Sequence, residues 1–140
     1  LYKKNLFETF EFPPALIIGL SESLSYLNKL GIKKIEKKIK NLSIYFRKKI
    51  KKINNVNVYE NPLLLSGINT ISVEKKPVEK IHKYLLKKNI LTSICTTSTS
   101  YHYFEKMNVK KLLRISFHHY NTRKEIDYLV EVLNDLAKSN

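Results

Sequence analysis

The sequence predicts an α+β domain in which a small, mostly antiparallel sheet is covered on one face by helices. Apolar residues recur every three or four positions in four separate segments, which is typical of amphipathic helices. Short segments between them alternate apolar and polar residues, as half-buried strands do. The 140 residues suffice to bury one core without disulfides or metals, so we expect a single domain over residues 1–140.

Two helices and two strands are expected in the first half of the chain. Pro13 and Pro14 suit a first helical turn, and Gly31 suits the end of that helix. The second helix covers residues 33–53, where lysines fill most positions between the apolar ones. Residues 56–59 and 68–73 then alternate like strands, and we expect them to pair with each other.

A third helix, a strand and a loop follow. Pro77 opens the helix, and Asn89 suits its C-terminal cap after a lysine-rich last turn. Residues 90–94 are expected to form a strand. A hydroxyl-rich run and an aromatic cluster over residues 95–104 then predict a loop or a short turn of helix.

The last strand places an arginine on the less apolar face of the sheet. Alternation puts Leu113, Ile115 and Phe117 on one face of residues 112–117 and Arg114 on the other. The final helix follows at once. Thr122 and Glu125 have the spacing of a capping box, and apolar residues recur behind them at helical spacing to the end of the chain.

This block resembles the C-terminal signature of the class V aminotransferase family. These fold-type I pyridoxal-phosphate enzymes include cysteine desulfurases, isopenicillin-N-epimerase-like proteins and C–S lyases. The triplets Arg114-Ile115-Ser116, Tyr120-Asn121-Thr122 and Glu125-Ile126-Asp127 match the family in order and spacing. Residues 7–11 followed by 18–20 resemble the family's entry into its small domain, and residues 88–90 resemble the turn before a strand that leads to the active-site loop.

The resemblance implies that the chain is the C-terminal small domain of a larger enzyme, and that the large cofactor-binding domain is absent from these residues. The first residue is Leu and not Met, as expected for a fragment or a processed piece. Pyridoxal 5'-phosphate would be bound by the missing large domain, and the full-length enzyme would be a homodimer acting on an amino acid. The segment alone is expected to hold no catalytic residue and to be inactive.

Arg114 is the residue to which the resemblance assigns a site. In the family the matching arginine holds the α-carboxylate of the substrate, and a planar guanidinium suits this role because it donates two parallel charge-assisted hydrogen bonds. The alternative for an isolated arginine on a strand is a structural ion pair. Residues 96–104 would form one wall of the active site. The implied reaction is C–S cleavage or cysteine desulfuration.

Cys95 raises the possibility of a sulfur acceptor, because desulfurases carry a nucleophilic cysteine on the loop before this arginine. The family's cysteine would fall within residues 97–100, whereas Cys95 ends an apolar strand, where a buried inert thiol is the usual outcome. We favour the inert thiol, and the hydroxyl-rich loop resembles the C–S lyase branch, which lacks the loop cysteine. In the family the cofactor-binding lysine follows a histidine, as Lys83 follows His82 here. This pair lies in a predicted helix, however, so we expect it to form part of a solvated helix face.

No metal site is expected. His102, His118 and His119 lack a carboxylate or thiol at a recognised ligand spacing, and the two adjacent histidines should point to opposite faces of a strand end.

The composition leaves one non-enzymatic alternative open. The formal charge is +14, from 26 basic and 12 acidic residues, so the lysine-rich helix could bind nucleic acid or an anionic surface. Only Arg47, Arg114 and Arg123 are arginines, whereas recognition of base edges and phosphates favours arginine, so we do not expect a nucleic-acid partner. A single cysteine and the lack of a long apolar run or signal-peptide pattern predict a cytoplasmic protein without a membrane partner.

Overall fold

The computed structural model of the chain describes residues 13–63 and 65–138, in two units, Leu1–Ile35 and Glu36–Asn140. Within the first unit, helix α1 (Pro14–Leu30) begins at the predicted proline pair and ends where Gly31 adopts φ 84°. No residue of α1 is buried. The stretch 7–11 that supported the family resemblance lies outside the described residues.

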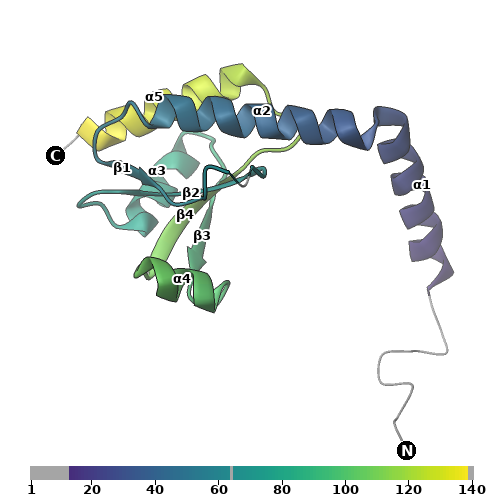
Figure 1. Cartoon of the computed structure of the whole chain (residues 1–140), viewed down its shortest axis with the longest axis horizontal. Helices are drawn as coiled ribbons and strands as arrows, with labels where there is room; N and C mark the ends of the chain where they lie inside the picture. Colours follow the sequence, from purple (N-terminus) through teal and green to yellow (C-terminus); the bar gives the residue numbers. More distant parts are fainter. Residues whose placement is uncertain (1–12, 64, 139–140) are drawn as a thin grey trace, which may run out of the picture. The chain divides into compact units, whose positions relative to one another are not determined.

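The second unit is built on a four-stranded sheet (Figure 1). Its strands are β1 (Val56–Val58), β2 (Ile68–Val73), β3 (Ser93–Thr96) and β4 (Lys111–Ser116), in the spatial order β1-β2-β4-β3. Each neighbouring pair is antiparallel. The predicted pairing of the first two strands and the predicted antiparallel α+β architecture are therefore confirmed.

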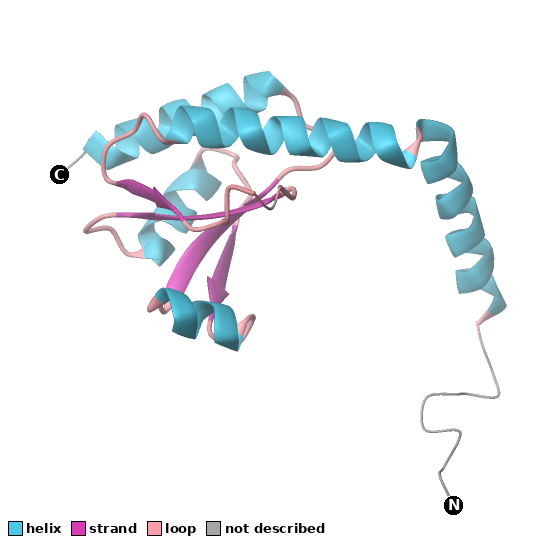
Figure 2. Cartoon of the chain, in the orientation of Figure 1, coloured by secondary structure: helices cyan, strands magenta, loops and turns pink. Residues whose placement is uncertain are grey.

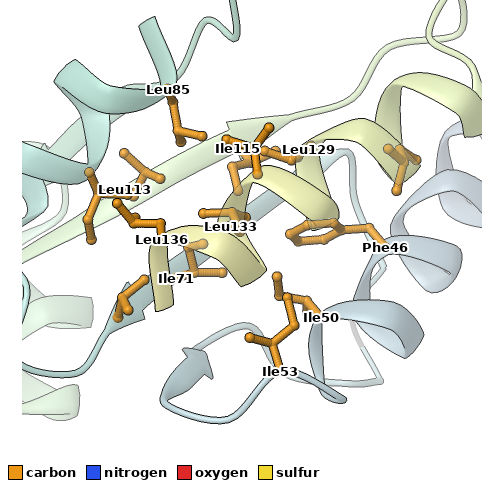
Figure 3. Close-up of a cluster of buried hydrophobic side chains, with 14 of the residues drawn as sticks. Phe46, Ile50, Ile53, Ile71, Leu85, Leu113, Ile115, Leu129, Leu133 and Leu136 are labelled. Carbon is orange, nitrogen blue, oxygen red and sulfur yellow. The ribbon is translucent and has the colours of Figure 1, made fainter. Parts of the chain in front are cut away.

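Three helices cover one face of this sheet, namely α2 (Ile32–Ile50), α3 (Val78–Lys87) and α5 (Arg123–Lys138) (Figure 2). Their apolar stripes meet the alternate residues of β2 and β4 that point toward them. The resulting core contains Phe46 and Ile50 of α2, Ile81 and Leu85 of α3, Ile71 of β2, Leu113 and Ile115 of β4, and Leu129 and Leu133 of α5 (Figure 3).

The opposite face of the sheet carries a smaller apolar cluster. Helix α4 (Tyr101–Met107) packs there, and its Phe104 forms this cluster with Cys95 and Leu112. Arg114 lies on this second face, because Leu113 and Ile115 occupy the core side of β4. The predicted orientation of the arginine agrees with this division, because Leu113 and Ile115 belong to the main core and Leu112 belongs to the smaller cluster.

The predicted capping box starts α5. The Thr122 backbone N–H donates to Glu125 Oε2 at 2.7 Å, and the Glu125 backbone N–H donates to Thr122 Oγ1 at 3.3 Å. This reciprocal pair satisfies two backbone donors that the helix itself leaves unpaired.

Two predicted boundaries were wrong. The second helix ends at Ile50 and not at residue 53, although Ile53 still packs into the core from the following turn. The strand predicted at residues 90–94 spans Ser93–Thr96, because Asn89 turns with φ 59° and the Ile90 N–H donates to the Leu85 carbonyl, which extends the cap of α3. Cys95 consequently lies within the strand and not at its end.

Candidate active-site pocket

An open pocket of about 720 Å³ lies beside the second face of the sheet, and Lys40 of α2 also borders it. Its floor is formed by residues of the sheet that include Thr70, Cys95 and Arg114. One wall comes from Glu60 and the segment that follows β1, and another from Thr99, Ser100, Tyr103 and Phe104. Arg114 and the 96–104 segment, which were predicted to form one site, therefore line the same cavity.

Strand register places Arg114 between two hydroxyl residues. Arg114 is opposite Thr70 on β2 and Ser93 on β3. Its Nη2 atom donates to Ser93 Oγ at 3.5 Å, which is the limit of a useful hydrogen bond, and its Nε atom is buried without a partner. None of the ion pairs found among residues 13–63 and 65–138 includes Arg114. The guanidinium thus keeps most of its donors available for an anionic ligand.

Glu60 is the acidic side chain of this pocket. Its Oε1 atom accepts hydrogen bonds from the Thr70 backbone N–H at 2.5 Å and from Thr70 Oγ1 at 2.6 Å. Its Oε2 atom is buried and has no partner. Two hydrogen bonds to one oxygen fix the orientation of the carboxylate.

The segment that leads from β3 to α4 is ordered by its own hydroxyl groups. Thr99 Oγ1 donates to the Thr96 carbonyl at 2.6 Å, and Thr96 Oγ1 lies 2.7 Å from Ser98 Oγ. Behind this turn the Tyr103 hydroxyl donates to the Tyr59 carbonyl at 3.0 Å. Burial raises the pKa of the Tyr103 phenol, so the group stays a neutral donor.

Cys95 is a free and buried thiol that packs with Phe104 and Leu112. Its Cα is paired with Leu112 in the ladder of β3 and β4, so the backbone at this position is fixed. Burial among apolar side chains limits the access of a substrate or reagent to the sulfur atom. Cys95 also borders the pocket, and its assignment as an inert thiol and not as a sulfur acceptor stays a prediction.

The histidines and Lys83 are not among the residues that line this pocket. Lys83 is exposed, as predicted, and His82 Nδ1 contacts Thr92 Oγ1 at 2.9 Å. The prediction that His118 and His119 point to opposite faces was wrong, since their Nδ1 atoms are 2.8 Å apart; the residues follow the end of β4, where strand alternation no longer applies. In the described part of the chain no three histidine, cysteine or carboxylate side chains could share a metal ion.

The lysine-rich face of α2 is partly engaged in ion pairs. Lys40 contacts Glu36 within the helix, and Lys49 contacts Asp127 of α5, both at 2.5 Å. The Tyr45 hydroxyl also donates to Asp127, at 2.8 Å, so this set joins α2 to α5. Among the described helices none is long and apolar enough to cross a bilayer.

Sequence reasoning missed Glu60. Glu60 lies between the two predicted strands, and no spacing rule connects it with Arg114. The register of β2 with β4 makes the connection, because it brings Thr70, the partner of Glu60, next to Arg114.

Comparisons with known proteins give the family. The model of the class-V aminotransferase family matches residues 4–129. A probable cysteine desulfurase of Borreliella burgdorferi is 32% identical over 136 residues, which are 96% of this chain and 32% of the relative. A cysteine desulfurase of Wigglesworthia glossinidia brevipalpis is 33% identical over 126 residues, 87% of this chain and 29% of the relative. The chain thus spans about a third of these relatives' length.

Solved structures give the same fold. A cysteine desulfurase from Escherichia coli superposes with a TM-score of 0.83 at 22% identity, over 93% of this chain and 32% of that one. A cystine C–S lyase in complex with cysteine persulfide superposes with a TM-score of 0.59 at 16% identity, over 74% of this chain and 24% of that one. The comparisons give no support to a basic nucleic-acid-binding domain. The chain belongs to the class V aminotransferase family.

Proposed function

We propose that residues 36–140 supply the substrate-carboxylate site and one wall of the active site of an enzyme that acts on a sulfur-containing amino acid. The observation that supports this is Arg114, a pocket-lining guanidinium with an unpartnered Nε and no carboxylate neighbour at ion-pair distance in the part of the chain that is described. A structural arginine on a strand would have its charge satisfied locally.

The cofactor of this family is generally pyridoxal phosphate, which acts as an electron sink for bonds broken at Cα or Cβ of an amino acid. The described residues do not form a site for it. Lys40 is the lysine that borders the pocket, and its ammonium is paired with Glu36 on the exposed side of α2, whereas an imine-forming lysine must be able to lose its charge. We therefore propose that the cofactor is bound by residues beyond this chain.

The side chains in the pocket favour C–S cleavage over transfer of sulfur to this segment. The turn at residues 96–100 presents hydroxyl groups, and the nearby thiol of Cys95 is buried in an apolar cluster. These groups can shape the site and exclude water, and the sulfur of Cys95 is buried. Desulfuration with a sulfur acceptor from outside this segment is the second candidate, because the relatives in the comparisons are named cysteine desulfurases.

Substitution of Arg114 in the full-length protein tests the carboxylate site. Arg114→Lys keeps the charge but removes the planar fork, and we expect it to raise KM for the amino-acid substrate about tenfold or more. Arg123→Lys is the matched control, because Arg123 lies over the ring of Tyr45 outside the pocket. An unchanged KM in Arg114→Lys would remove the assignment.

The isolated chain provides a second test. Incubated with pyridoxal phosphate, it should acquire no stoichiometric imine absorbance at any specific lysine, because the pocket lacks a lysine suited to that role. Stable and stoichiometric attachment would contradict the proposal that residues beyond this chain bind the cofactor. We also propose that the longer protein is a cytoplasmic homodimer, on the strength of the family resemblance and the single unpaired cysteine.

A further inference from the structure

Helix α1 has an apolar face that is exposed in the described structure. Leucines recur on it every three or four residues, at positions 16, 20, 24 and 27, and Ile17 lies beside them. At about 100° per residue, these positions cover about 100° of the helix circumference, which is typical of a helix that packs on a core. Yet Leu16 is 70% exposed and Leu20 is 58% exposed, and no residue of the helix is buried.

The composition of α1 also differs from that of the solvated helix that follows it. Of the 17 residues of α1 only Glu22 and Lys29 are charged, whereas nine of the 19 residues of α2 are charged. A protein with a formal charge of +14 thus has one helix with a single lysine. The side chains of α1 therefore suit burial better than contact with water.

The second unit does not need α1 to complete its core. Its main buried cluster is formed by α2, α3, α5, the sheet and the adjoining turns, and contains no residue of α1. The chain, however, spans only about a third of the length of its relatives, so most of a longer protein of this kind would lie outside residues 1–140. A body of that size has a core of its own on which a helix can pack.

We propose that α1 packs, through its leucine stripe, on the body formed by residues of the longer protein outside this chain, and that the boundary between the two domains lies near Gly31. This rests on the proposed function, in which those outside residues bind the cofactor. Gly31 ends α1 with φ 84°, and α2 begins at the next residue. The chain then contributes to two domains and not to one.

Two other partners fit the helix less well. A helix of 17 residues is about 25 Å long and about 10 Å wide, so pairing α1 with its copy alone would bury on the order of 500 Å². A stable interface between two proteins buries about 1,200–2,000 Å². A helix that lies on a membrane surface is rich in lysine and arginine on its polar side, whereas the polar side of α1 is mainly serine and asparagine.

Photo-cross-linking in the full-length protein identifies the partner. Ile17→p-benzoylphenylalanine places the reactive group at the edge of the leucine stripe, where a large side chain is easiest to accommodate. Irradiation should join it to a segment outside residues 1–140 of the same polypeptide, which mass spectrometry would find in a product of monomer mass. Glu22→p-benzoylphenylalanine, on the opposite side of the helix, should give about fivefold less of this product.

Thermal unfolding of the full-length protein gives the second readout. Leu24→Gln should lower the melting temperature by about 5 °C or more, because it removes an apolar contact and buries an amide without a partner. Glu22→Gln introduces the same side chain on the opposite side of the helix. It should change the melting temperature by less than about 2 °C.

Several results would overturn the inference: a cross-link to residues 36–140, a cross-linked product of dimer mass, no peptide product at all, or a Leu24→Gln variant as stable as the wild type. Equal cross-linking from positions 17 and 22 would contradict packing through the stripe. If Leu24→Gln does not fold, the cross-linked product decides. The KM of Arg114→Lys tests the proposed function separately, since an unchanged KM would remove the carboxylate site without altering where α1 cross-links.

Discussion

Asn69→Ala should destabilise the second unit by removing the main partner of a buried charge. Arg47 is only 7% exposed and Asn69 is fully buried. Arg47 Nε donates to Asn69 Oδ1 at 2.7 Å, and Asn69 Nδ2 donates in turn to Ser43 Oγ at 3.2 Å. The remaining bond of the guanidinium, to the Asn61 carbonyl, is longer at 3.3 Å, and its Nη2 atom has no partner.

The magnitude follows from what the substitution leaves behind. A hydrogen bond to a charged group contributes about 1.5–3 kcal/mol, and a buried donor left without a partner costs about 1–3 kcal/mol, or more when the group is charged. We expect the free energy of unfolding to fall by about 3 kcal/mol. Replacing both partners, as in Arg47→Met with Asn69→Leu, removes the stranded charge and should cost no more than about 1 kcal/mol.

Urea unfolding of the wild type, Arg47→Met, Asn69→Leu and the double variant gives the double-mutant cycle, and Asn69→Ala is measured beside it. The double variant should be more stable than Asn69→Ala by about 2 kcal/mol. A loss below about 1 kcal/mol in Asn69→Ala, or a double variant less stable than either single one, would refute the reasoning. The same network holds the wall of the pocket, because Ser43 Oγ donates to the Ser66 carbonyl at 2.5 Å.

Three further predictions follow from single contacts. Gly67→Ala should lower the melting temperature, since its added Cβ would lie 2.4 Å from the Phe117 carbonyl oxygen, whereas Gly19→Ala, with nothing within 4 Å, should not. The pKa of Glu125 is lowered mainly by a backbone hydrogen bond at the start of α5. The stability that this carboxylate contributes is therefore present above the pKa of an unfolded glutamate and is lost as the pH falls through its lowered pKa in the folded protein. Acid titration followed by circular dichroism should show that Glu125→Gln loses less stability over this pH range than the wild type does. Cys95 should react with a thiol reagent about 100-fold more slowly in the folded protein than in urea, and equal rates would contradict its burial.

The parts of the fold that depend on neighbours in sequence were predictable. Alternation along β4 gave the side of the sheet on which Arg114 lies, and the Thr122 and Glu125 spacing gave the start of α5. Local pattern also gave the C-terminal turn of α3, but not its length, because the contact of Ile90 with the helix end extends the cap at the expense of the strand.

The parts that depend on register were not predictable. Glu60 and Arg114 are far apart in sequence and are brought to one cavity by the pairing of β2 with β4. The buried network of Arg47 was missed for a similar reason, since its partner Asn69 occupies a strand position that the alternation pattern alone gives no reason to link to a helix. A lysine-rich helix gives no signal that its single arginine points inward.

Neighbouring positions of strand β4 are under different selection, for core packing at some and for ligand contact at others. Leu113 and Ile115 pack in the core and stabilise the domain, whereas Arg114 between them lies outside the core. A lineage could therefore alter ligand preference at residue 114 without destabilising the core, and a library randomised at residue 114 alone should yield well-folded members in high proportion. Alternation along one strand thus allows the ligand-contacting residue and the core residues to change at different rates in evolution.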